Sequence, residues 1–429
     1  MQLQKNLFVP IPNISPAPNL HLGVQYFIPE WDDRVDSGFD FLTDSFSPNR
    51  KPYDDIYAHQ IYPKPNYDGI LISRTVIDKS KKKKAYIETY GIRQLIKYQG
   101  KIMGDCGAFG YIKEEKPPYT IDEILDYYKQ LNVDYGVSID HLIVGQFAAP
   151  GIREKRYELT LNNAFWFMQK YRDRSNSNFT PIGVAQGWNP ESYASAVQEL
   201  IKMGYTYIAL GGIARAPTQY ILEILMAVRP YLKPHIKLHI FGVGRINAVP
   251  AFRHLGVTSF DSASPLRSAW LDSASNYHTI FGKTYAAIRI PLVDGYGVRI
   301  KRILAANKNQ TKLHQKLKKL EQESLQAMRD FDAGKLSLEK SLKAVLAYDE
   351  LLELPRDGQV KPEAKARRQQ KHAEMYRELL EDKPWKYCDC RICQELGAEV
   401  VIFRGNDRNR RRGFHNTYIF YKRFQELLQ

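Results

Sequence analysis

The chain has few cysteines and no long apolar run. A membrane-spanning helix needs about 20 consecutive apolar residues, and no segment of the 429-residue sequence approaches that length. The opening segment MQLQKNLFVPIPNISPAPNL has no basic start followed by an apolar stretch, so we expect no signal peptide. Three of the four cysteines lie within six positions, which disfavours a disulfide framework. These absences favour a cytoplasmic protein without membrane association.

Acidic residues are scarce relative to basic ones. The chain has 62 Lys and Arg against 47 Asp and Glu, a formal net charge of +15. A positive field raises the local concentration of polyanions, so nucleic acid is the leading class of partner. A basic soluble protein without such a partner is equally compatible with composition alone.

Short apolar runs alternate with amphipathic stretches up to about residue 270. The runs are apolar on both faces, as in parallel strands covered by helices. Eight of them predict a (β/α)₈ TIM barrel in the α/β class. An open doubly wound sheet is the alternative. The predicted strands are LGVQYFI (22–28), DGILISR (68–74), KIMGD (101–105), DYGVSID (134–140), PIGVAQ (181–186), YTYIALGG (205–212), KLHIFGVG (237–244) and VTSFD (257–261).

The composition changes twice along the chain, which predicts three domains. Residues 1–298 would form the barrel with an N-terminal extension. Residues 299–383 are strongly charged with a helical period, and predict an inserted block of two or three basic helices. Residues 384–429 would form a zinc-binding subdomain packed on the barrel. Within the barrel, KSKKKK (79–84) is expected to be a solvated loop, with phosphate contact as the alternative.

The cysteine cluster predicts a closed metal site. Three thiolates and one imidazole form a standard tetrahedral set for zinc, with no position left for water, so the metal would be structural. The segment AEVVIF (398–403) would be a strand between the ligands, and RNRRRG (408–413) would add positive charge beside the site for a polyanion. The predicted ligands are Cys388, Cys390, Cys393 and His415.

Polar and aromatic residues follow several predicted strands. In such barrels, residues at the C-terminal strand ends carry the function. Carboxylates and an amide suit the edges of a flat heterocycle, aromatic rings suit its faces, and two carboxylates remain for attack at carbon and proton transfer. For any single residue, a cap or a turn is the alternative role. The candidates are Asp105, Phe109, Asp140, Gln186, Gly211, Gly212, Phe241 and Asp261.

Six of these eight residues, all except Asp140 and Phe241, lie in segments that resemble, in order, the motifs of the tRNA-guanine transglycosylase superfamily of base-exchange enzymes. The segments are DCGAFG (105–110), GVAQG (183–187), LGGIA (210–214), GVG (242–244), FDSASPLR (260–267) and the zinc signature CDCRIC with HNTYIFY (388–393 and 415–421). The resemblance implies that Asp261 attacks the sugar C1′ of a guanosine nucleotide and forms a covalent intermediate with overall retention. It also implies that Asp105 transfers protons. Asp140, Gln186 and Gly211–Gly212 would read the base between Phe109 and Phe241.

Departures from the family pattern point to a substrate. Pro217 stands where the queuosine branch has a glutamate, which fits a neutral base such as 7-cyano-7-deazaguanine. The insertion before Cys388, and the chain end 14 residues after His415, resemble the DNA-guanine transglycosylase branch (DpdA type) rather than archaeal members with an RNA-binding domain. The resemblance implies DNA, a free 7-deazaguanine base and a partner ATPase as partners. The alternatives are tRNA as substrate, or a non-catalytic nucleic-acid-binding zinc subunit, which the presence of Asp105 and Asp261 disfavours.

Overall fold

The computed structural model describes residues 8–51, 53–174, 178–295, 297–352 and 362–429. These residues divide into two compact units. The barrel unit contains the described residues up to Asp33, together with Lys64–Ala263 and Arg423–Gln429. The second unit contains Arg34–Pro63 and Ser264–Lys422. The domain boundaries expected after residues 298 and 383 stay a prediction.

The barrel unit is built on eight parallel strands that pair in chain order and close on themselves. Closure comes from the pairing of the last strand with the first, in which Phe27 is opposite Asp261. The predicted (β/α)₈ barrel is therefore confirmed, and the open sheet is wrong. The strands are β1 (Gln25–Pro29), β2 (Gly69–Ser73), β3 (Lys101–Asp105), β4 (Tyr135–Val137), β5 (Thr180–Ala185), β6 (Tyr207–Leu210), β7 (Lys237–Ile240) and β8 (Ser259–Asp261).

The barrel interior is filled by large side chains from alternate strand positions. Burial of such apolar surface is the main term that stabilises a fold. This core contains Phe27, Leu71, Met103, Tyr135, Val137, Ile182, Val184, Tyr207 and Ala209. Outside it, Gly104 and Gly136 let the buried ring of Tyr128 approach β3 and β4 closely, since a Cβ at Gly104 would lie 2.6 Å from that ring.

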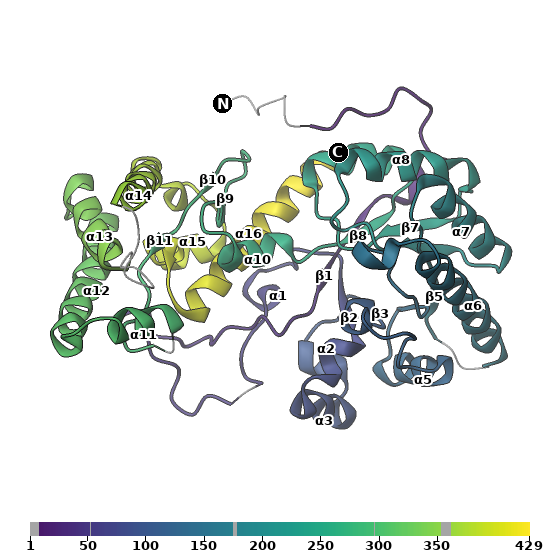
Figure 1. The fold of residues 1–429 in the computed structure, drawn as a ribbon, viewed down its shortest axis with the longest axis horizontal. Helices are drawn as coiled ribbons and strands as arrows, with labels where there is room; N and C mark the ends of the chain where they lie inside the picture. Colours follow the sequence, from purple (N-terminus) through teal and green to yellow (C-terminus); the bar gives the residue numbers. More distant parts are fainter. Residues whose placement is uncertain (1–7, 52, 175–177, 296, 353–361) are drawn as a thin grey trace. The chain divides into compact units, whose positions relative to one another are not determined.

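Helices connect the strands and cover the outside of the barrel, where Figure 1 shows α5 to α8. Two have clear start signals, because Thr120 and Asn189 each accept a hydrogen bond from the backbone three residues on. The helices are α2 (Arg74–Asp78), α3 (Lys81–Tyr90), α4 (Ile92–Ile96), α5 (Ile121–Leu131), α6 (Ile152–Asp173), α7 (Pro190–Lys202), α8 (Thr218–Val228) and α9 (Val249–His254), with 3₁₀ turns η2 (Leu20–Leu22), η3 (Ala108–Tyr111), η4 (Gly145–Ala148), η5 (Arg229–Tyr231) and η6 (Ile246–Ala248).

The segment KSKKKK is not the solvated loop that was expected. Ser80 caps α3, and the following lysines form its first turn. Lys83 is buried and pairs with the buried carboxylate of Glu30, which follows β1. The other carboxylate oxygen of Glu30 accepts the N–H of Asp32 at 2.8 Å. The sequence interpretation failed because one lysine of the run faces a buried acid while its neighbours face solvent.

The second unit is mainly helical. The charged block forms four helices among the described residues, α11 to α14, rather than the two or three expected. A new helix begins after α11 because the Asn309 side chain accepts a hydrogen bond from the N–H of Lys312 and caps the start of α12. The elements are α1 (Ala58–Ile61), α10 (Ser264–Leu271), α11 (Val298–Ala305), α12 (Gln310–Asp332), α13 (Leu338–Leu352), α14 (Pro362–Asp382), η7 (Pro384–Lys386), α15 (Arg391–Leu396), η8 (Gly397–Val401) and most of α16 (Gly405–Leu428), with strands β9 (Tyr277–His278), β10 (Thr284–Tyr285), β11 (Ile288–Arg289) and β12 (Ile402–Phe403). The last residues of α16, from Arg423, belong to the barrel unit.

Two expectations for the end of the chain are wrong. AEVVIF is mostly the 3₁₀ helix η8, because Asp332 accepts the N–H of Ala398 at 3.0 Å and folds the chain there; only its last two residues are a strand. The arginines of RNRRRG are largely buried rather than offered to a polyanion. Arg408 pairs with Asp44 and Glu399, and Arg412 donates to the carbonyl of Ala269 at 2.6 Å.

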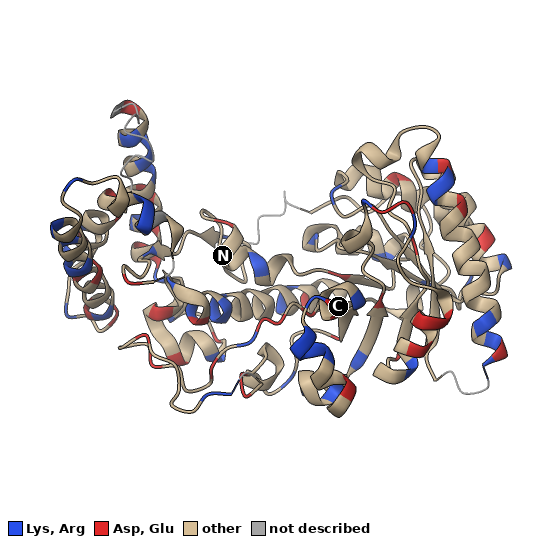
Figure 2. Ribbon diagram, turned by 60° about the horizontal axis from the view of Figure 1, so that its bottom comes forward, with Lys and Arg blue, Asp and Glu red and all other residues tan. Residues whose placement is uncertain are grey.

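Charge is mixed rather than segregated along the helices. Figure 2 shows Lys and Arg interspersed with Asp and Glu on helices of both units. On α6, for example, Arg174 at the helix end pairs with Asp122 and Asp126 of α5. Among the described residues, no helix is both long and apolar enough to cross a membrane.

Replacing Lys83 by Met is expected to lower the free energy of unfolding by about 3–5 kcal/mol, because the buried carboxylate of Glu30 loses its cation. Urea denaturation would measure the change. The control is Lys82→Met, since Lys82 is exposed on the same turn and its loss is expected to change stability by less than about 0.5 kcal/mol. Equal effects of the two variants would contradict the buried pairing.

Candidate active site and metal centre

Three carboxylates lie at the C-terminal ends of the barrel strands. Asp105 ends β3, Asp261 ends β8, and Asp140 follows β4 by three residues. The charges of Asp140 and Asp261 both act on Asp105. The ends of parallel strands form one rim of the barrel, which is where TIM-barrel enzymes hold their functional residues. The structure therefore brings these three candidates together at one mouth.

The environment separates the pKa values of two of these carboxyl groups. Burial raises the pKa of Asp105 to about 8, and the charges of Asp140 and Asp261 add to the rise. The N–H of Gly107 donates to Asp105 Oδ2 at 3.0 Å, which opposes it. Burial raises the pKa of Asp140 only to about 6, because a hydrogen bond from Gln186 favours the carboxylate. Near neutral pH, Asp105 therefore favours its neutral form and Asp140 its charged form, so the two carboxyl groups can serve different purposes.

Gln186 connects Asp140 to the glycine pair after β6. Its Nε2 donates to Asp140 Oδ2 at 2.7 Å, and its Oε1 accepts the N–H of Ile143 at 3.4 Å. A Cβ at Gly211 would lie 2.2 Å from Nε2, and one at Gly212, where φ is +77°, would lie 2.8 Å from Oε1. Both positions therefore need glycine for the amide to lie there. The fixed amide and carboxylate suit recognition of the polar edge of a heterocycle.

Asp261 is held by a backbone amide and by a histidine that was not predicted from the sequence. The N–H of Gly242 donates to Asp261 Oδ1 at 2.8 Å, and His239 Nε2 lies 3.2 Å from the same oxygen. His239 is fully buried. The signal for it was available in the two-residue period of β7, which places His239 on the same face as the candidate Phe241.

The two aromatic candidates differ in their surroundings. Phe241 is partly buried against the barrel core, with its ring centroid 4.7 Å from that of His239. Phe109, on η3, is 63% exposed. An exposed ring beside the mouth is available for stacking on a base, but enclosure of a base between Phe109 and Phe241 stays a prediction.

Two other polar residues near the carboxylates are engaged in packing. Cys106 is buried with its Sγ 3.4 Å from the hydroxyl of Tyr128, and burial raises the pKa of its thiol well above the ordinary value. A neutral buried thiol is a poor nucleophile, so the surroundings of Cys106 favour a packing role. His141 is buried, and its Nε2 lies 2.9 Å from the carbonyl of Glu114. Burial lowers the pKa of His141.

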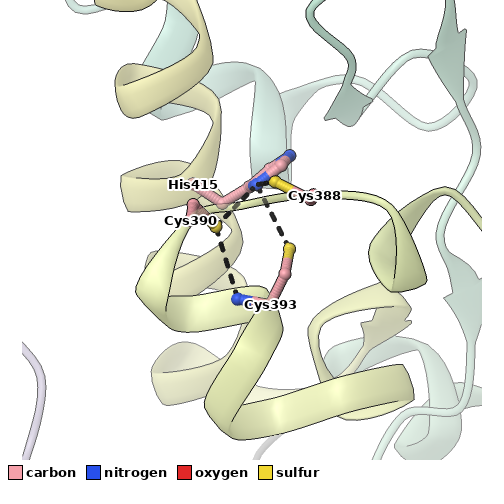
Figure 3. A group of neighbouring side chains, drawn as sticks. All are labelled: Cys388, Cys390, Cys393 and His415. Atoms are coloured by element: carbon pink, nitrogen blue, oxygen red, sulfur yellow. Dashed lines mark hydrogen bonds between the residues drawn. The ribbon is translucent and has the colours of Figure 1, made fainter.

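The four predicted metal ligands converge in the second unit, as Figure 3 shows. Their ligand atoms all lie within 4.8 Å of one another. His415 Nδ1, on α16, lies 3.6, 3.2 and 3.3 Å from the sulfurs of Cys388, Cys390 and Cys393. A tetrahedral zinc with ordinary bond lengths separates its sulfur and nitrogen ligands by about 3.6 Å. The donor atoms and their spacing therefore fit a closed Cys₃His metal site.

Neighbouring groups orient the histidine of this cluster. The carbonyl of His278 lies 2.8 Å from His415 Nε2, and therefore Nε2 carries the hydrogen of the ring. The lone pair of Nδ1 is then directed into the space between the three sulfurs, where a metal would be held. Tyr277 stacks on the imidazole with a centroid distance of 4.2 Å, and its hydroxyl lies 3.2 Å from the Sγ of Cys393. Such outer contacts are typical of metal-binding histidines.

Comparison with known proteins identifies relatives of this chain. Residues 64–284 match the family model described as queuine tRNA-ribosyltransferase. The chain is 37% identical over 424 residues to the DNA-guanine transglycosylase of Salmonella montevideo, covering 94% of this chain and 97% of that protein. It is 26% identical over 183 residues to the tRNA-guanine(15) transglycosylase of Pyrobaculum aerophilum, covering 40% of this chain and 35% of that protein. The corresponding enzyme of Pyrococcus furiosus is 26% identical over 208 residues, or 46% and 34% of the two chains.

The matched region includes every barrel strand from β2 to β8, and therefore all the candidate residues at the mouth. The protein is thus a pentosyltransferase of the guanine transglycosylase class. The chain belongs to the queuine tRNA-ribosyltransferase family.

The purified protein is expected to contain one metal ion per chain at the Cys₃His cluster, measurable by elemental mass spectrometry. Cys390→Ser should lose this ion, because a hydroxyl is a much poorer soft-metal ligand than a thiolate. Cys106→Ser, at the buried cysteine outside the cluster, should retain it. Retention of the metal by Cys390→Ser would show that the ion is held elsewhere.

Proposed function

We propose that the protein exchanges guanine in DNA for a 7-deazaguanine base. The observation that carries the proposal is the similarity to the Salmonella DNA-guanine transglycosylase, which extends over 94% of this chain. The archaeal tRNA-guanine(15) transglycosylases from Pyrobaculum and Pyrococcus match less than half of it, 40% and 46%. Similarity over 94% of the chain extends past residue 284 into the helices outside the matched family model. We therefore favour DNA over tRNA.

The first chemical step is displacement of guanine by Asp261. A carboxylate oxygen of Asp261 forms a bond to the sugar C1′ while the bond from C1′ to the base nitrogen breaks, and its electron pair leaves with guanine. Asp105 supplies the proton that neutralises the departing base, which its raised pKa supports. The incoming base then loses a proton to Asp105 and displaces Asp261. Two displacements at C1′ give net retention.

Base recognition is assigned to the opposite side of the mouth. The carboxylate of Asp140, the amide of Gln186 and the backbone of Gly211–Gly212 would read the polar edge of the base, with Phe109 and Phe241 on its faces. Asp140 can accept hydrogen bonds from ring N–H groups because a hydrogen bond from Gln186, at 2.7 Å, favours its charged form. Recognition by buried polar groups discriminates strongly, since a wrong base leaves them unpaired.

The loop after the glycine pair favours a neutral incoming base, and 7-cyano-7-deazaguanine is our candidate. Residues 213–217 read Ile-Ala-Arg-Ala-Pro and contain no carboxylate to pair with an aminomethyl cation. Arg245 is directed to the same loop, where it donates to Thr218 Oγ1 at 2.9 Å and to the carbonyl of Ala216. Cationic surroundings disfavour a cationic base.

The target guanine must leave the base stack to reach Asp261, which lies inside the barrel mouth and is 6% exposed. The enzyme would therefore act on a flipped or single-stranded nucleotide. The net charge of +15 supports binding to the phosphate backbone. The support for a partner ATPase is the family resemblance alone.

We assign zinc to the Cys₃His cluster, held by Cys388, Cys390, Cys393 and His415. The set has four protein ligands, so the metal would be structural and offer no open position. Its contribution is to hold the loop before α15 against α16, which supplies His415. We place no step of base exchange at this site.

The proposal is tested by incubating the protein with guanine-labelled DNA, or with guanine-labelled tRNA, and with 7-cyano-7-deazaguanine. Release of guanine from DNA is expected, with a covalent protein–DNA adduct that survives denaturation. Asp261→Asn should abolish release and adduct, because an amide is a poor nucleophile, while DNA binding persists. Release from tRNA alone would overturn the choice of DNA. Equal behaviour of Asp261→Asn and the unmodified protein would overturn the catalytic proposal.

The rate of exchange should fall both at low pH and at high pH. Below about pH 6, Asp140 becomes protonated and base binding weakens, since the pKa of Asp140 is raised to about 6. Above about pH 8, Asp105 loses the proton needed by the leaving base, since the pKa of Asp105 is raised to about 8. The plot of kcat/KM against pH is thus expected to be bell-shaped. Asp105→Asn should lower the rate by about 10²–10⁴ and remove the alkaline limb. An unchanged limb would contradict the assignment.

A further inference from the structure

A chain of buried polar groups runs from the barrel core to Asp261. His239 Nε2 lies 3.2 Å from Asp261 Oδ1, and His239 Nδ1 lies 2.9 Å from Ser259 Oγ. The hydroxyl of Tyr207 lies 2.6 Å from the same Ser259 Oγ. His239 and Ser259 are 0% exposed and Tyr207 is 1% exposed. Three consecutive polar contacts thus lie beside a core that is filled mainly by apolar side chains.

The direction of the hydrogens follows from the carboxylate. An ionised Asp261 can only accept, so His239 donates from Nε2. The other ring nitrogen then accepts from the hydroxyl of Ser259, and Ser259 in turn accepts from the hydroxyl of Tyr207. Each group of the chain has its partner, which is the condition for a buried polar network to be stable.

We propose that His239 is a positioning residue for Asp261, fixed in its donor tautomer by Ser259 and Tyr207. The proposal rests on the proposed role of Asp261 as nucleophile. Together with the N–H of Gly242, at 2.8 Å, His239 places two donors on Oδ1. Both donors bind the same oxygen, so the carboxylate cannot rotate freely and Oδ2 is the oxygen directed to form the bond to C1′.

The same two donors act most strongly in the second displacement. In the covalent intermediate Asp261 is an ester, Oδ1 is its carbonyl oxygen, and the group carries no charge. When the incoming base attacks C1′, the bond from C1′ to Oδ2 breaks and its electron pair returns to the carboxylate. Donors already aimed at Oδ1 stabilise this returning charge without reorganisation, as preorganised donors stabilise developing negative charge in acyl transfer. Loss of His239 should therefore prolong the life of the adduct.

The test compares His239→Leu, which removes the donor, with His239→Gln, whose amide Nε2 replaces it. Single-turnover exchange on labelled DNA would give the rate of adduct formation and the rate of its discharge by 7-cyano-7-deazaguanine. His239→Leu is expected to slow discharge by about 10²-fold, with the KM for the base changed less than about threefold. His239→Gln should recover most of the rate. His235→Leu, at an exposed histidine, is the matched control and should behave like the unmodified protein.

A second variant changes the network at Tyr207, which contacts Ser259 rather than Asp261, and leaves the aromatic ring in the core. Tyr207→Phe removes only the hydroxyl that fixes Ser259, and should slow discharge by about three- to tenfold, the cost of one neutral hydrogen bond. Unchanged discharge in His239→Leu, or equal losses in His239→Leu and His239→Gln, would overturn the positioning role. Absence of any adduct from the unmodified protein would instead overturn the proposed function, and this inference with it.

Discussion

Pairing of β8 with β1 is the constraint on which the site depends. Without closure, Asp261 would lie at the edge of a sheet, far from Asp105 on the third strand. Closure places both strand ends on one rim and directs their side chains to a region with little water. Removal from water, more than any single contact, is what raises the pKa of Asp105 and of Asp140. The fold therefore sets the chemistry of the carboxyl groups as well as their positions.

Within that mouth, the three carboxylates are distinguished by their hydrogen-bond partners rather than by residue type. Asp140 receives a side-chain amide, Asp105 receives a backbone amide from the next turn, and Asp261 receives a backbone amide together with an imidazole. The same type of side chain can take different roles because a hydrogen-bond donor favours the charged form of the carboxyl group that it contacts, whereas burial favours the neutral form. The roles proposed here follow those differences.

Much of this could be predicted from the sequence, and the rest failed for physical reasons. All eight strands were found, because each is a short run that is apolar on both faces. The convergence of the Cys₃His cluster was also predicted, because cysteines in such close spacing have few other uses. His239 was missed because a single histidine inside an apolar run is readily taken for a core residue, and the two-residue period alone does not show its partner. Its proposed role depends on Asp261, 22 residues later, through strand pairing. Lys83 and the arginines of α16 were misjudged because charge in a sequence does not reveal whether an opposite charge is buried beside it.

The buried arginines of α16 have a consequence for binding to nucleic acid. Binding to a phosphate backbone gains free energy when condensed counterions are released, one for each phosphate that a mobile cation neutralises. Arg408 and Arg412 are 1% and 0% exposed and already hold protein oxygens, so they release none. The number of ions released on binding must therefore be smaller than the basic residues of the sequence suggest, and a shallow dependence of affinity on salt would be compatible with a strongly basic chain.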